Sequence, residues 1–200
     1  MERNLRITGS STKTFSPDTV TVYMNLEAVS KTADSAKTVF TSKSTLLKNI
    51  VDQLGFNSED IRTEHFYVDK NYEYTNNQRI QNGFKAECTY SLTMDLDYDS
   101  LESLISSLSQ ALQMRITYDV LLKNREEEEK AVLKLAVEDA KKKAEDVAEA
   151  CGVTLGDIVG INYDDMHGAV GFRSVSSTDG ALAPSDVKIT KSIEIMWEIK

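Results

Sequence analysis

The chain has 200 residues, 40% of them hydrophobic and 28% charged, so one large or two small domains with a sizeable core are expected and a disordered chain is excluded. Its 23 basic and 32 acidic residues give a formal net charge of −9, which disfavours nucleic acid and anionic membranes as partners because both require a basic surface. No apolar run is longer than three residues, so no membrane insertion is expected.

The first residues do not show the pattern expected of a secretion signal. Residues 1–7 contain neither an apolar stretch of signal-peptide length nor a small-residue cleavage site. The sequence as written therefore predicts a cytoplasmic protein, and a periplasmic or cell-envelope protein if a signal has been removed from it.

The first half of the chain alternates between strand and helix patterns. Apolar residues at every second position predict a strand over 20–28, and apolar residues at helical spacing predict a helix over 33–54. A strand over 61–68 leads to a predicted hairpin tip at 72–78. The clearest alternation in the chain then predicts a long strand over 84–98, with one buried and one exposed face.

Two helices and a strand follow. A short helix is predicted over 100–112 with Asp99 as its cap, and a strand over 116–122. The second long helix is predicted over 125–151, where Asn124 and the glutamate three residues on have capping-box spacing.

A Gly- and Ser-rich segment separates the last two predicted strands. The segment 164–186 is expected to be a long loop, which is either functional or a disordered surface insertion. After it, alternation over 187–199 predicts a final strand, in which Lys191 interrupts the apolar face.

A faint internal repeat suggests how these elements group. The same pattern follows each long helix: a glycine, an apolar residue, any three residues and then Asp-Ile. It occurs at residues 55–61 and 152–158. We therefore predict an α+β fold: a single domain over 1–200 with two strand–helix–strand–strand units, 1–98 and 99–200. The expected sheet is mainly antiparallel, has one buried face and is packed by two long helices.

The common motifs of catalysis and cofactor binding do not occur. The chain has no phosphate-binding loop, nucleophile elbow or zinc-ligand spacing, so no catalytic residue, cofactor or metal is predicted. His65 is expected to be a structural strand residue. His167 stands beside Asp164 and Asp165, which is either a solvated cluster or a divalent-cation site.

Aromatic residues gather around the predicted hairpin. Tyr67, Tyr72 and Tyr74, together with Phe66, lie on or beside it. Tyrosines supply large contact area at low entropic cost, so these three are the candidate interaction residues. The alternative is that they cover the end of the sheet.

The order of several short motifs resembles the SIMPL-domain family, catalogued as a domain of unknown function. The motifs are Gly9 in an opening strand, Pro17-Asp18, Leu54-Gly55, Asp60-Ile61-Arg62-Thr63, Tyr72-Glu73-Tyr74, Gly83-Phe84-Lys85-Ala86, the Ala/Lys-rich helix running into Gly152-Val153-Thr154-Leu155-Gly156, and Trp197 in a closing strand. The resemblance implies an α+β fold of strand–helix–strand units, ring-forming oligomers in some members, and links to stress defence and the cell envelope. It implies no catalytic residues.

Three hypotheses about function follow. The first is a non-enzymatic self-assembling or partner-binding protein. It is expected to be a homo-oligomer, and the alternative is that it binds a protein partner that is not identified. The second is a small-ligand binder or an enzyme with an unmarked site between the two halves. The third is a thiol-based stress sensor using Cys88 or Cys151, although both thiols are expected to be buried and reduced.

Overall fold

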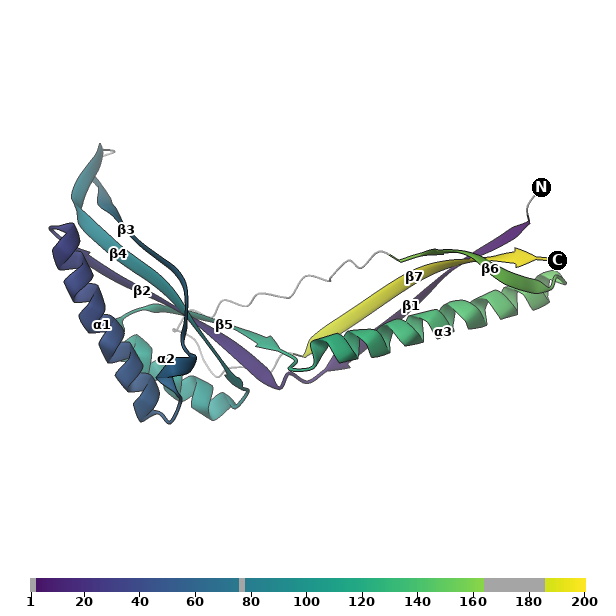
Figure 1. Ribbon diagram of the computed structural model, residues 1–200, viewed down its shortest axis with the longest axis horizontal. Helices are drawn as coiled ribbons and strands as arrows, with labels where there is room; N and C mark the ends of the chain where they lie inside the picture. The colour runs from purple at the N-terminus through teal and green to yellow at the C-terminus, as the bar shows by residue number, and fades with distance from the viewer. Residues whose placement is uncertain (1–2, 76–77, 164–185) are drawn as a thin grey trace. The chain divides into compact units, whose positions relative to one another are not determined.

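Figure 1 shows the computed structural model of the chain, which describes residues 3–75, 78–163 and 186–200, with the backbone alone at residues 74 and 75. In chain order the elements are β1 (Asn4–Phe15), β2 (Thr19–Ser30), α1 (Ala33–Gln53), the 3-10 turn η1 (Ser58–Asp60), β3 (Arg62–Thr75), β4 (Gln78–Asp95), α2 (Tyr98–Leu112), β5 (Arg115–Leu121), α3 (Arg125–Cys151), β6 (Leu155–Asn162) and β7 (Val187–Ile199). The strands form two antiparallel sheets with helices packed on them, which confirms the α+β class.

The chain forms two compact units that interleave along the sequence. Residues 18–121 form the inserted unit, and residues 3–17, 122–163 and 186–200 form the split unit. The chain enters and leaves the inserted unit at adjacent points, where the Asp18 amide donates a hydrogen bond to the Leu121 carbonyl oxygen at 3.2 Å. These bounds differ from the halves 1–98 and 99–200 expected from the internal repeat.

The inserted unit is a four-stranded sheet in the order β3-β4-β2-β5, with α1 and α2 on one face (Figure 1). Its core follows the alternation read from the sequence, because Val22, Met24 and Leu26 on the central strand β2 are fully buried. Paired strand residues share a face, so the register places Leu92 opposite Val22 in the same core.

The split unit is a three-stranded sheet in the order β1-β7-β6, with α3 packed mainly on β1 and β7 (Figure 1). An alanine stripe lets the helix lie close to the sheet, where Ile195 and Trp197 of β7 are buried. The approach is closest at Gly9, where an added Cβ would overlap the backbone of Ala136 and Ala140. Gly9 is therefore required for this packing.

Lys191, which interrupts the apolar face of β7, is paired rather than solvated. Its ammonium lies 3.0 Å from the carboxylate of Glu129, which also accepts a 2.7 Å hydrogen bond from Arg125. This network satisfies a lysine that is only 6% exposed.

The strand next to α3 is not the one that the repeat predicts. β5 precedes α3 in the sequence, but β5 pairs with β2 in the inserted unit. The strand of the split unit that comes before α3 is β1, which pairs with β7 along its whole length. Each long helix is thus followed by two strands of its own unit, but α3 takes its preceding strand from the start of the chain.

The ends of the helices correct several sequence predictions. The long strand β4 ends at Asp95, and Tyr98 begins α2, which is capped by Asp97 rather than Asp99. Asn124 makes no side-chain hydrogen bond to α3, because its φ of −107° and ψ of 37° are not the extended conformation of a capping residue. The predicted stop of α3 is confirmed, since Gly152 adopts φ +67°.

Candidate interaction surfaces

The three candidate tyrosines lie along β3, the edge strand of the inserted unit. Tyr67 is 46% exposed and Tyr72 is half-buried. The backbone of Tyr74 continues β3 to the hairpin, but its side chain lies outside the described residues, as does the tip at 76–77. The hairpin between β3 and β4 thus carries the residues singled out from the sequence.

A hydrogen-bonded cluster on the open face of the sheet holds Tyr67 in place. The carboxylate of Glu87 accepts hydrogen bonds from Lys85, from Tyr67 and, at 3.0 Å, from Asn25. Burial alone would raise the pKa of Glu87, but these donors outweigh it and lower the pKa to about 2. The hydroxyl of Tyr67 is thus directed at the Glu87 carboxylate on the open face of the sheet.

On the helix side of the same edge, Phe66 continues an aromatic row out of the core. Its ring centroid lies 5.2 Å from that of Phe40 on α1, and Phe40 lies 6.4 Å from Tyr90. Tyr90 is in turn held by a 2.9 Å hydrogen bond with Ser44. Phe66 is 51% exposed, so this supported ring forms an apolar rim beside α1.

The hairpin extends past the last paired residue of β2. That residue is Ser30, which is opposite Phe84, whereas β3 and β4 continue to pair beyond this point. In the extension the guanidinium of Arg79 lies 3.7 Å from the centroid of the Tyr72 ring, and Ile80 is 49% exposed. The extension therefore presents a cation stacked on an aromatic ring and an exposed aliphatic side chain.

The backbone edge of β3 is poorly suited to adding another strand. The pairing with β4 shifts register between Thr63 and His65 and again between Lys70 and Tyr72. Charged side chains and irregularities of this kind guard natural edge strands against strand addition. A contact made through the hairpin is therefore expected to use its side chains and not its backbone edge.

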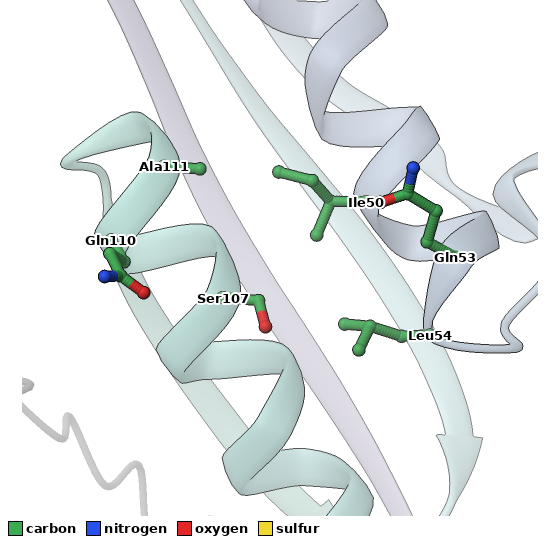
Figure 2. Close-up of a pocket in the computed structure, with 6 residues that line it drawn as sticks. All are labelled: Ile50, Gln53, Leu54, Ser107, Gln110 and Ala111. Atoms are coloured by element: carbon green, nitrogen blue, oxygen red, sulfur yellow. The ribbon is translucent and has the colours of Figure 1, made fainter.

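A groove lies between α1 and α2 on the helix side of the inserted unit (Figure 2). Its volume is about 420 Å³, and its lining residues are Ile50, Gln53, Leu54, Ser107, Gln110 and Ala111. Aliphatic side chains form its apolar part, while two carboxamides and a hydroxyl supply polar groups. None of the six is charged, which is typical of the centre of a protein interface.

The apolar lining continues along α1 beyond the groove. Leu46 and Val39 precede Ile50 by four and eleven residues, which at about 100° per residue places them on the same flank of the helix. Val39 and Leu46 are 41% and 43% exposed. Sequence reasoning missed the groove, and this extra apolar flank was the signal that could have found it.

The two cysteines differ in environment. Cys88 lies in the core of the inserted unit, and burial raises the pKa of its thiol, which disfavours the thiolate that a redox sensor needs. Cys151 ends α3 in the split unit and is exposed, contrary to the expectation that both thiols are buried.

The structure describes one of the two histidines. His65 lies on β3 and is exposed. The cluster of His167, Asp164 and Asp165 falls outside the described residues, as does most of the predicted loop 164–186. Within the described ranges no group of three or more His, Cys, Asp or Glu residues is arranged to hold a metal ion, and no helix is long and apolar enough to cross a membrane.

The family model named SIMPL, a protein of unknown function (DUF541), matches residues 5–197. The chain belongs to the SIMPL family. One relative, the uncharacterized protein YggE of Edwardsiella ictaluri (strain 93-146), is 26% identical over 149 residues, which cover 74% of this chain and 62% of the relative. The match thus spans less than two thirds of the length of that curated relative.

Proposed function

We propose that this chain is a self-assembling protein whose copies contact one another through the β3–β4 hairpin. The observation that carries the proposal is the exposed apolar surface of the two hairpin strands, where Phe66 and Tyr67 on β3 and Ile80 on β4 are each about half-exposed. Exposed large apolar groups on a fixed scaffold are typical of interaction surfaces. The stress-response and cell-envelope links implied by the family resemblance belong to the same proposal, as settings in which such an assembly would act.

The proposal is tested by the mass of the protein in solution. Light scattering behind a sizing column, at two protein concentrations and two salt levels, is expected to give several subunits for the wild-type chain. Tyr72→Ala combined with Ile80→Ser removes the aromatic and aliphatic groups of the hairpin extension and is expected to shift the mass towards the 22.3 kDa monomer.

The matched control is Val147→Ser, which removes a 38% exposed apolar side chain from α3 in the split unit. It is expected to leave the mass unchanged. A wild-type protein that is monomeric under all four conditions, or a hairpin variant with the wild-type mass, contradicts the proposal.

A further inference from the structure

We propose that Asn82 is a site of spontaneous deamidation, at which the side-chain carboxamide is lost as ammonia and strand β4 gains an aspartate or an isoaspartate. The reaction requires that the residue after the asparagine leave its amide nitrogen open to the side chain, and glycine hinders that approach least. Asn82-Gly83 is the one Asn-Gly pair in the sequence. The inference is independent of the proposed self-assembly, because it concerns the covalent structure of β4.

The pair lies at an irregularity of the β3–β4 ladder. The register shifts between Lys70 and Tyr72, so that Asn71 of β3 is opposite two residues of β4, Asn82 and Gly83. Gly83 adopts φ +83°. A β-bulge of this kind interrupts the ladder and leaves one residue unpaired. The peptide group between the two residues is therefore not held in the geometry of a regular strand.

The side chain of Asn82 is available for the reaction. It is exposed, and it makes no hydrogen bond with the other residues that the structure describes. Rotation about its Cα–Cβ and Cβ–Cγ bonds can therefore bring the carboxamide carbon to the nitrogen of Gly83.

The side chain of Asn71 assists the attacking group. Its Nδ2 donates a hydrogen bond of 3.2 Å to the carbonyl oxygen of Asn82. That oxygen belongs to the same peptide group as the Gly83 nitrogen, and resonance moves negative charge onto it when the nitrogen loses its proton. A donor held where negative charge develops stabilises the charged species. Asn71 thus promotes formation of the nucleophile.

The reaction is a hydrolysis whose co-reactant is water. The Gly83 nitrogen loses its proton to solvent and bonds to Cγ of Asn82, and the carboxamide nitrogen leaves as ammonia, which closes a succinimide ring. Water then adds to one of the two ring carbonyl carbons and breaks its bond to nitrogen. Cleavage at Cγ gives aspartate. Cleavage at the backbone carbonyl carbon gives isoaspartate, in which the main chain runs through Cβ and Cγ.

Asn57-Ser58 is a comparable pair that the structure protects. Of the residues that follow an asparagine in this sequence, serine is the smallest after glycine. The Ser58 amide, however, donates a 2.8 Å hydrogen bond to the Asp52 carboxylate. The side chain of Asn57 accepts a 3.1 Å hydrogen bond from the Glu59 amide as the cap of η1. Both reacting groups are engaged elsewhere, so Asn57 is expected to be stable in the folded protein.

Conversion of Asn82 changes the base of the hairpin extension. A Cβ atom on Gly83 would overlap the carbonyl oxygen of Ser30, the last residue of β2 that pairs with β4. β4 thus runs closely past the end of β2 at this point. An isoaspartate adds one carbon to the main chain immediately before this contact, so the pairing of β3 with the start of β4 must adjust. An aspartate leaves the main chain unchanged and adds one negative charge.

The test follows deamidation in the full chain, native and unfolded in guanidinium chloride, at the same neutral pH and temperature. Trypsin releases the peptide 80–85, in which Asn82 is the single asparagine. Mass spectrometry and an isoaspartate methyltransferase assay then measure the two products. Asn82 is expected to convert at similar rates in both states. Asn57 is expected to convert more slowly in the native chain by on the order of tenfold or more, because two hydrogen bonds must break first.

Two substitutions test the chemistry. Asn82→Gln keeps a carboxamide on a longer side chain, which would have to close a larger ring, and it is expected to abolish the product at position 82. Asn71→Asp keeps the shape of the side chain but replaces the donor with an acceptor. It is expected to slow the native reaction by on the order of fivefold and to leave the rate in the unfolded chain unchanged.

Native protection of Asn82 as strong as that of Asn57 overturns the inference, because the bulge would then hold its peptide group as firmly as the cap holds Asn57. A wild-type rate in native Asn71→Asp overturns the role assigned to Asn71. Neither result depends on the mass of the protein in solution, so failure of this inference and failure of the proposed self-assembly are distinguishable.

Discussion

At the scale of single residues, the carboxylate of Glu87 connects side chains from three strands on the open face of the sheet. It lies on β4 opposite β3, and three donors from three strands converge on it: Asn25 of β2, Lys85 of β4 and Tyr67 of β3. Because the donors stabilise the charged form, Glu87 remains ionised in the folded protein at pH values where a free glutamate takes up a proton. Its charge thereby fixes Tyr67.

We expect Glu87→Gln to lower the free energy of unfolding of the inserted unit by about 1–3 kcal/mol at pH 7, since hydrogen bonds to a charged group are lost. A carboxylate whose pKa is lowered by folding contributes stability above its unfolded pKa, near 4.5, and loses it as the pH falls to about 2. The difference between wild type and variant should therefore shrink over that interval in denaturant unfolding followed by tyrosine circular dichroism.

The control for this prediction is internal to the chain. Trp197 is the single tryptophan and lies in the split unit, so its fluorescence reports a unit that Glu87 does not belong to. Its unfolding transition is expected to be the same in both proteins. A stability difference between wild type and variant that stays constant from pH 7 to pH 2 contradicts the predicted linkage.

At the scale of secondary-structure elements, the packing of α3 on β1 depends on the absence of one side chain. Position 9 meets the helix backbone, and the neighbouring Ser10 amide donates a 2.9 Å hydrogen bond to the Asp139 carboxylate of the same helix. Helix α3 and strand β1 are therefore held together by the close approach at Gly9 and by the hydrogen bond from the Ser10 amide to Asp139. The alanines of α3 complete this fit.

Gly9→Ala is expected to destabilise the split unit by about 1–3 kcal/mol, because α3 must move away from the added methyl group. Trp197 fluorescence during denaturant unfolding measures the effect. Ser10→Ala serves as the matched variant, since it changes an exposed side chain and keeps the amide that bonds to Asp139. Equal stabilities of the two variants would show that the close approach is not tight.

Local patterns predicted the elements well because each is encoded by neighbouring residues. The alternation around Val22 and the alanine stripe of α3 gave strand and helix in the right places. The helix starts were less accessible, because Asp97 and Asp99 are both good capping residues and only backbone geometry selects between them. Tyr98 is apolar and continues the alternation of β4, so the strand was predicted to run to residue 98. In the structure β4 ends at Asp95, and Tyr98 begins α2.

The partner of each strand and the site depended on contacts between distant residues. Nothing near Gly9 indicates that β1 pairs with β7, or that β5 leaves α3 for β2. Tyr67 and Tyr72 could be singled out as aromatic residues near a turn, but Glu87 beneath Tyr67 could not be identified among 32 acidic residues. The groove brings Leu54 together with Ser107, and no sequence spacing encodes that proximity.

At the scale of the whole molecule, the described residues of one unit are continuous in sequence and those of the other are not. Residues 18–121 contain the four strands and two helices described for the inserted unit, and every core residue described for it lies in this range. The split unit combines three segments of the chain. Independent stability is accordingly expected of the inserted unit by itself.

A fragment of residues 18–121 should fold when expressed alone, giving cooperative thermal unfolding and dispersed amide resonances. The matched fragment is 1–98, the half suggested by the internal repeat. It lacks β5 and nearly all of α2, so one edge of β2 is unpaired and the buried side chains Leu101, Leu104 and Leu108 are missing from the core. This second fragment is expected to be unfolded or aggregated. The opposite result for either fragment contradicts the assignment of the units.

The pairing of β1 with β7 also sets an order of events during synthesis. Ribosomes add about 5–20 residues per second, so β1 leaves the ribosome on the order of ten seconds before the strand it pairs with exists. The inserted unit can complete its fold within that interval. The nascent chain then carries one folded unit and the strand β1, which must remain unpaired without aggregating. The polar residues at every second position of β1, from Asn4 to Thr14, keep the unpaired strand soluble.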